Sequence, residues 1–342
     1  MGSGKKSKSK SSSPPSEVFF DLPTPPSTAS IPPTFEAYTS KYGQSAKYQN
    51  VYDFVKGMYT GKRVDAIVDV WCEAPIRKVW KEFADSALSP EDRNTKWGAL
   101  EYWFVIGVHP HNAKEYDDQI EAEILEAMKH PRCVGWGEMG LDYHYDNSPR
   151  DIQQAVFIRQ VKHAVSLKKP LTIHTREADA DTERILKENV PKDHPIHIHC
   201  FTDSPEFGQR LLDHFPNLCI GITGVITFAT NHDTPNIVRR MADPSASSSS
   251  TSISTSPLRI LLETDAPYMV PSNIYASLYD MPNGNDLRGR RLPLSHSAMI
   301  PWTASFVAGV VNSKDESGDG DKVDSEWVLK VARDNARMVY GV

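Results

Sequence analysis

Short apolar segments that end beside a residue able to bind a metal ion recur five times in this chain. They are WFVIGVHP with His109, VGWGEMGLD with Glu138, PLTIHTR with His174, IHIHCF with His199, and ILLETDAP with Asp265. A β-strand of this length and composition is typical of a parallel sheet that is buried on both faces. The polar residue is expected where the strand emerges, because an unpaired charge in a protein core is too costly.

Helix-like stretches separate these segments, at about 119–129, 150–168, 178–190 and Glu206–His214. This alternation of strands and helices predicts an α/β fold with a parallel sheet. A length of 342 residues suits one TIM-type (βα)₈ barrel with tails. In such a barrel the C-terminal ends of all strands open onto one face, where the chemistry takes place. The polar residues from 109 to 265 are therefore expected to meet there.

Two kinds of segment interrupt or precede the alternation. Residues 1–45 are rich in Lys, Ser and Pro, so we expect a disordered tail with a possible first strand at 18–21. The prolines of residues 21–33 suit neither a helix nor a central strand. We expect the barrel domain over 46–342, starting with a helix over Val51–Tyr59 and a strand over Ala66–Trp71. A serine-rich loop, 243–257, and an acidic linker, 313–325, would project from it.

Composition excludes several classes of protein. No apolar run is long enough to span a bilayer, and no apolar segment follows the basic N-terminus to form a secretory signal. The four cysteines lie in no paired spacing, which is typical of reduced thiols in an intracellular protein. We expect a monomer in the nucleus or cytoplasm. The net charge of −6 gives no global attraction to nucleic acid, so any such binding needs a local basic patch.

Glu138, His174, His199 and Asp265 form the predicted metal site. A lone histidine at a strand end is more often a hydrogen-bonded structural residue, but four such placements on one edge favour ligands. Imidazole suits Zn²⁺ and Mn²⁺, carboxylates also accept Mg²⁺, and a glutamate can bridge two ions. His197 is expected to point away from His199, toward the helices, and to be structural. The set predicts a metal-dependent hydrolase.

At these motifs the chain resembles the TatD family of metal-dependent deoxyribonucleases. The matching stretches are GVHPH (107–111), GEMGLDYH (137–144), LTIHTREAD (171–179), HIHCF (197–201) and LLETDAPYMVP (261–271). The resemblance implies a TIM-type barrel in which Glu138 bridges two divalent ions. It also implies His174 and His199 on one ion, Asp265 on the other as ligand or general base, and His109 near the substrate phosphate.

One family motif is missing from this chain. TatD proteins usually carry His-x-His at the end of the first strand. Here VFFD (18–21) would be that strand, and Pro23 and Pro25 stand where the histidines belong. An alignment to VDVWCEA (68–74) offers only Trp71 and Glu73. We therefore expect one tight ion and a weak second one, unless activity is lost or this N-terminus is not the natural one. Asp203 also replaces a family glycine.

A nuclease needs positive charge beside its metal site to neutralise phosphates. Arg176 follows His174 on the same face, and Arg288, Arg290 and Arg291 lie in the loop after the last strand. These arginines are candidates for binding nucleic acid, DNA or RNA; the loop cluster could equally be a solvated loop or an import signal. Tyr143, Tyr145 and Tyr268 adjoin the motifs and could stack bases.

The expected function is metal-dependent cleavage of phosphodiester bonds in DNA or RNA, from an end of the strand. Two other functions fit the same residues. An amidohydrolase-like enzyme could use the same fold and ligands on a small molecule. A catalytically weakened binding or scaffold protein could have kept the barrel and lost the first metal site.

Overall fold

The computed structural model describes residues 24–243, 258–277, 291–313 and 322–342, and its centre is a parallel sheet. Eight strands follow one another around this sheet in sequence order. They are β1 (Ser27–Ala29), β2 (Ala66–Trp71), β3 (Glu101–Ile106), β4 (Cys133–Asp142), β5 (Leu171–Arg176), β6 (Ile196–Ile198), β7 (Leu218–Ile222) and β8 (Ile260–Leu262). Side chains join β1 to the end of β8, because Thr28 donates a hydrogen bond from Oγ1 to Glu263. The predicted (βα)₈ barrel is confirmed.

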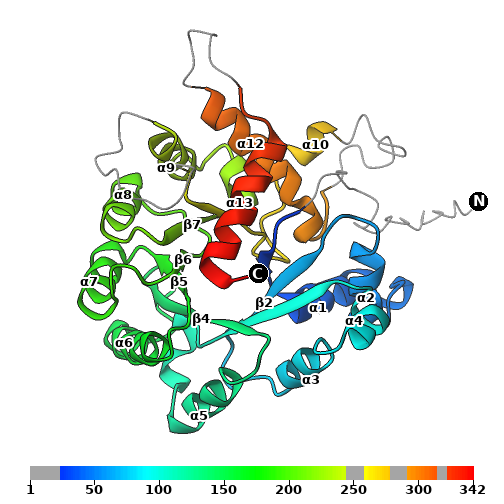
Figure 1. The fold of residues 1–342 in the computed structure, drawn as a ribbon, viewed down its shortest axis with the longest axis horizontal. Coiled ribbons are helices and arrows are strands. Elements are labelled where there is room, and N and C mark those ends of the chain that lie inside the picture. The colour runs from blue at the N-terminus through cyan, green and yellow to red at the C-terminus, as the bar shows by residue number, and fades with distance from the viewer. Residues whose placement is uncertain (1–23, 244–257, 278–290, 314–321) are drawn as a thin grey trace, which may run out of the picture.

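Helices surround the strands (Figure 1). They are α1 (Ile31–Tyr42), α2 (Val51–Tyr59), α3 (Val79–Asp85), α4 (Pro90–Trp97), α5 (Asp118–Ala127), α6 (Arg150–Ser166), α7 (Asp179–Asn189), α8 (Pro205–His214), α9 (Asp233–Met241), α10 (Ile274–Ser277), α12 (Ile300–Asn312) and α13 (Ser325–Tyr340). Several begin at the side chain that caps them: Asp117, Ser204 and Asp324 accept hydrogen bonds from backbone N–H groups of the first turn. Within the described ranges, no helix is long and apolar enough to cross a membrane.

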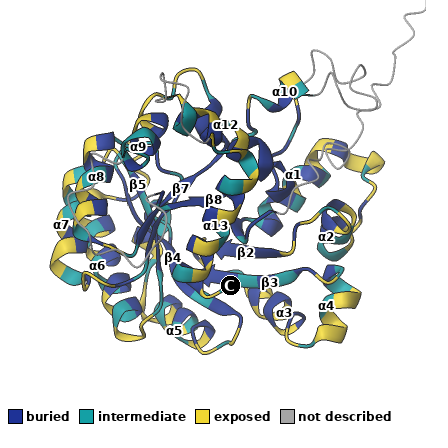
Figure 2. Cartoon of the chain, turned by 45° about the horizontal axis from the view of Figure 1, so that its top comes forward, coloured by how far each residue is buried: buried dark blue, intermediate teal, exposed yellow. Residues whose placement is uncertain are grey.

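The strands are buried on both faces, and the helices expose only their outer sides (Figure 2). In β2, Val68 and Val70 belong to an apolar cluster inside the barrel, whereas Ile67 packs in the larger core beneath the helices. Successive side chains point to opposite faces of the sheet, and both faces are buried, so the strand sequences are continuous apolar runs.

The last helix closes one end of the barrel. Val339 and Tyr340 of α13 pack inside the barrel with Val68, and Asn335 donates to the carbonyl groups of Leu258 and Ile260 at the start of β8. The hydroxyl of Tyr340 lies 2.7 Å from Thr172 Oγ1 near the start of β5. These contacts are made at the N-terminal ends of the strands, so the opposite end is left for a site.

Regular structure begins earlier than the sequence suggested. The expectation of a disordered segment up to residue 45 is wrong for residues 24–45, which form β1, α1 and a short 3₁₀ helix. Pro32 and Pro33 stand in the first turn of α1, where a missing backbone N–H costs nothing. The possible strand at 18–21 lies outside the described residues, and Ser27–Ala29 supplies the first strand of the sheet.

Two glycines of β4 let the backbone of β5 come close to it. Gly137 has φ 152° and Gly140 has φ 148°. A Cβ at Gly137 would lie 2.3 Å from the carbonyl oxygen of Thr172, and a Cβ at Gly140 would overlap the carbonyl oxygen of His174. A side chain at either position is therefore excluded by conformation and by space. Both glycines lie beside the polar residues that end β4 and β5.

We predict that Gly140→Ala lowers the free energy of unfolding by about 2 kcal/mol or more, because the backbone of β5 must move. Chemical denaturation of the purified variant measures the change. Gly309→Ala is the matched control, since Gly309 lies on the exposed side of α12 with open space around its Cα. It should be neutral or stabilising by up to about 1 kcal/mol. A Gly140→Ala protein as stable as the control would contradict the close approach.

Candidate metal centre

The polar residues that end the apolar strands meet at the open end of the barrel. Glu138 comes from β4 and His174 from β5, His199 follows β6, and Asp265 follows β8. His109 follows β3 and begins the 3₁₀ helix Pro110–Glu115. Each comes from a different strand, and only the barrel brings them together.

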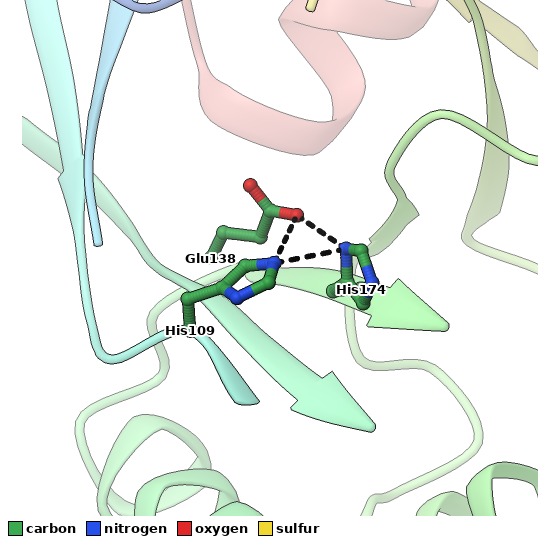
Figure 3. A group of neighbouring side chains, drawn as sticks. All are labelled: His109, Glu138 and His174. Carbon is green, nitrogen blue, oxygen red and sulfur yellow. Dashed lines mark hydrogen bonds and ion pairs between the residues drawn. The ribbon is translucent and has the colours of Figure 1, made fainter. Parts of the chain in front are cut away.

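Glu138 lies next to His109 and His174 (Figure 3). Its Oε1 lies 2.8 Å from His174 Nδ1 and 3.7 Å from His109 Nε2. The two imidazoles are themselves 3.3 Å apart at these nitrogens. One donor atom from each of the three residues lies within 4.8 Å of the others, a spacing that could hold a metal ion.

His199 approaches Glu138 from the other side. Its Nε2 lies 3.9 Å from Glu138 Oε2 and 3.6 Å from Asp265 Oδ1. Its Nδ1 lies 2.7 Å from Oε2 of the fully buried Glu263. A carboxylate behind a histidine fixes the orientation and tautomer of the ring, so Nε2 is directed at the two other carboxylates. Sequence motifs did not single out Glu263, although it lies in the quoted ILLETDAP segment.

The expectation for His197 is wrong in direction. His197 Nε2 lies 3.2 Å from the same Glu263 oxygen, and His197 Nδ1 lies 2.7 Å from the hydroxyl of Tyr340. Residues two apart on a strand share a face, so His197 points to the inside with His199 and not toward the helices.

Asp142, the last residue of β4, is a second carboxylate that the sequence motifs did not single out. Its Oδ2 lies 2.8 Å from His111 Nε2 and 3.3 Å from His174 Nε2. Its Oδ1 accepts the backbone N–H groups of His144 and Tyr145 at 2.9 and 3.1 Å. One buried carboxylate therefore holds both His174 and the loop that follows β4. Its position at a strand end, within the GEMGLDYH motif, was the available signal.

The site carries more negative than positive groups unless the imidazoles are protonated. Burial alone would raise the pKa of Glu138, but His199, His174 and His109 keep it well below its usual value. Burial alone would lower the pKa of His174, but its contacts with Asp142 and Glu138 raise it to about 9. Metal ligation requires neutral imidazole, so a divalent cation would replace these protons. The nitrogen and oxygen donor set fits such a cation.

The pKa values of three other groups, His109, Asp265 and Asp203, are shifted in the opposite sense. Burial and the neighbouring His174 lower the pKa of His109 to about 3, so this imidazole is neutral at physiological pH. Burial raises the pKa of Asp265, although His199 opposes the shift. Burial and the nearby Asp179 raise the pKa of Asp203 to about 7, and Asp203 accepts the N–H of Glu177 between the loops after β5 and β6.

The first strand supplies no imidazole. The first histidine of the whole sequence is His109, long after β1. Thr28 is buried and bonds to Glu263, and Ser30 follows it at the end of β1. The alternative residues are turned elsewhere: Trp71 donates to Tyr102, and Glu73 pairs with Arg77 at 2.6 Å.

The candidate phosphate-binding arginines are only partly brought to the site. Arg176 ends β5 and lies over the ring of Tyr145, with Cζ 4.8 Å from the ring centroid. Arg291 is exposed, and Arg288 and Arg290 lie outside the described residues. The serine-rich loop and most of the acidic linker also lie outside them.

Comparison with known proteins agrees with this geometry. The family model described as TatD related DNase matches residues 94–341. The human 3'-5' RNA nuclease TATDN2 is 43% identical over 178 residues, which are 52% of this chain and 21% of the human protein. The 3'-5' ssDNA/RNA exonuclease TatD of Rahnella is 29% identical over 240 residues, 70% of this chain and 77% of the relative.

A crystal structure of an uncharacterised amidohydrolase from Saccharomyces cerevisiae has the same fold, with a TM-score of 0.64 at 18% identity. The match covers 93% of this chain and 100% of the yeast chain. The chain spans only about a fifth of the length of the human relative, so the activity of that whole protein is not assigned to this chain on the basis of this match. The family model, by contrast, covers well over half of the chain and includes all the strand-end residues from His109 to Asp265. The chain belongs to the TatD-related DNase family.

Proposed function

We propose that this chain is a metal-dependent phosphodiesterase that removes nucleotides from the 3' end of DNA or RNA. The observation that carries the proposal is the meeting of Glu138, His174, His199 and Asp265 at the open end of the barrel. The human and Rahnella relatives are both named as 3'-5' nucleases. Action in the nucleus or cytoplasm, as a monomer, is part of the proposal.

Glu138, His174 and His199 would hold one divalent ion, which is Mg²⁺, Mn²⁺ or Zn²⁺ by the chemistry of the donors. When bound, the ion supplies Lewis-acid activation of the phosphodiester. Asp142 and Glu263 hold the rings of His174 and His199 so that both face Glu138. In known metal sites, loss of a carboxylate that orients a ligand lowers the metal affinity by about 10- to 100-fold.

The remaining residues would handle protons and phosphate. Asp265 has a raised pKa, which makes its carboxylate a suitable base for the attacking water. His109 is neutral and lies 3.7 Å from Glu138, so its imidazole can donate to a phosphate oxygen without repelling a cation. Arg176, Arg288, Arg290 and Arg291 are proposed to bind the phosphates of the strand.

A catalytically weakened binding protein is the second candidate, because β1 provides no histidine for a second ion. It differs from the first candidate in metal content and in turnover.

We predict that Glu138→Gln lowers the rate of metal-dependent cleavage of a single-stranded oligonucleotide by about 10²-fold or more. The amide keeps the size of the side chain but removes its charge, so the fold is retained. Cleavage rate and thermal unfolding are measured on the same preparation. Glu126→Gln is the control, since Glu126 is exposed on α5 and pairs with Lys129 at the protein surface. Undiminished cleavage by Glu138→Gln would remove Glu138 from the centre.

We predict about one tightly bound divalent ion per chain, and a second that enters only at high concentration. Glu138, His174 and His199 provide three donors for the first ion, whereas the Asp265 side lacks two imidazoles. Calorimetric titration of Mn²⁺ into the metal-free protein measures both affinities. Two equally tight ions would contradict the prediction, and no bound ion with a folded protein would favour the binding-protein candidate.

The position of β1 shows at which residue a histidine could be introduced to complete the second metal site. Pro23 lies outside the described residues, and Pro25 precedes β1, at the end of the strand opposite to the site, so a histidine at position 25 would not reach the site. Ser30 is partly exposed at the end of β1, and its side chain makes no cap bond to α1. Ser30→His is therefore expected to raise the affinity of the second ion roughly tenfold. Gln44→His, on the exposed surface, is the matched control and should leave both affinities unchanged.

A further inference from the structure

We propose that the ring of Tyr145 is a stacking platform for an unpaired base of the strand that is cleaved. This inference rests on the proposed function, because the base belongs to the strand whose phosphate is cleaved at the metal centre.

Tyr145 exposes 53% of its surface although it stands three residues after the buried Asp142. Tyr143, two residues earlier, is held quite differently. The hydroxyl of Tyr143 lies 2.8 Å from Asp181 on α7, and Arg150 covers its ring at 4.4 Å. Among the described residues, none hydrogen-bonds to the hydroxyl of Tyr145. Its ring, and not its hydroxyl, is therefore the feature that a ligand can use.

The ring of Tyr145 is supported by residues from other parts of the chain. The guanidinium carbon of Arg176 lies 4.8 Å from its centroid. The ring of His111 meets it at right angles with centroids 5.5 Å apart, and the ring of His144 meets it at 88° and 4.7 Å. A ring fixed in this way loses little conformational entropy when a base stacks on it. The cation beside it also adds attraction for a nucleotide and its phosphate.

The platform is tied to the same carboxylate as the metal ligand His174. Asp142 Oδ1 accepts the N–H of Tyr145 at 3.1 Å, and Asp142 Oδ2 lies 3.3 Å from His174 Nε2. The ring of His111 lies between the two, with centroids 5.5 Å from Tyr145 and 6.4 Å from His174. A base on Tyr145 and a phosphate at His174 would thus belong to the same or to adjoining nucleotides.

Such a base must be unpaired. In a duplex both faces of each base are occupied by its neighbours, so stacking on a protein ring requires the base to leave the helix at a cost of a few kcal/mol. A single-stranded end carries no such cost. Stacking also tolerates every base, because each has an aromatic face. Tyr145 is therefore expected to discriminate between unpaired and paired bases, and not between one base and another.

The test compares a single-stranded RNA octamer with two matched octamers that lack the base at the last or at the penultimate nucleotide. The native enzyme should show a KM on the order of tenfold higher for one of the abasic strands. In Tyr145→Ala the ratio of the two KM values should fall to about one, while kcat changes less than KM. Tyr145→Phe keeps the ring and should keep the ratio, which separates stacking from a role of the hydroxyl.

Several outcomes would overturn the platform. They are an unchanged KM ratio in Tyr145→Ala, a native enzyme that does not distinguish the abasic strands, a Tyr145→Phe variant that behaves like Tyr145→Ala, and equal cleavage of blunt duplex and single strand. Thermal unfolding checks that the exposed position tolerates alanine.

A failure of the proposed function has a different result. If the native protein cleaves none of the strands with Mn²⁺ present, the phosphodiesterase proposal fails, and binding alone tests the platform. An octamer with 2-aminopurine at its last nucleotide then serves as the probe, because stacking quenches its fluorescence. Quenching by the native protein that is lost in Tyr145→Ala supports the platform, and equal quenching by both proteins overturns it.

Discussion

The arrangement at the open end of the barrel depends on one constraint, the ionised carboxylate of Glu138 in a largely buried position. A buried carboxylate without partners would take up a proton, yet the pKa of Glu138 is held low by the imidazoles of His199, His174 and His109. The imidazoles of His199 and His174 are in turn held by Glu263 and Asp142, which are also buried. Each of these carboxylates thus has an imidazole partner, and Glu138, His174 and His109 present donor atoms within 4.8 Å of one another, a spacing at which a cation would be stabilised.

Backbone geometry places this group. Gly137 and Gly140 allow β5 to lie against β4 at a distance that a side chain would prevent, and His174 stands beside Glu138 for that reason. At the other end of the barrel, Tyr340 reaches His197, which contacts the same Glu263 that orients His199. A chain of contacts therefore runs from the closing helix α13 to the metal centre, and the closed end of the barrel supports the open end.

Much of this arrangement could be predicted from the sequence. Apolar runs on both faces of a strand are a strong signal, so the strands from Ala66 onward and the residues at their ends were placed correctly. The predicted helices over 119–129, 150–168, 178–190 and Glu206–His214 agree to within two residues, and Val51–Tyr59 agrees at both ends, whereas α3 and α4 were not predicted. The first strand was missed because STA is too short to show any period, and Pro32 and Pro33 hid the start of a helix that tolerates them.

The residues around the ligands were harder to predict for a different reason. Asp142 and Glu263 act through a contact with another strand, and neither their spacing nor their neighbours in sequence reveal that partner. His197 differs from these two carboxylates. Its direction follows from the period of a strand alone, so the prediction that it points toward the helices was avoidable. Ligand types can be read from a motif, whereas the carboxylates that orient them depend on the register between strands.

The two sides of Glu138 differ in a way that bears on chemistry. His174 and His109 contact Glu138 from β5 and from the end of β3. Arg176 and Tyr145 lie near them and are closer to the solvent. On the side of β1, Thr28 donates its hydroxyl to Glu263, and the strand carries no histidine. His199 Nε2 lies 3.6 Å from Asp265 Oδ1, and burial raises the pKa of Asp265 by more than His199 lowers it. A carboxylate in that setting holds a proton more readily than a tightly ligated one. This setting fits the proposed role of Asp265 as a base for the attacking water, because β1 brings no histidine that would join Asp265 in holding a second ion.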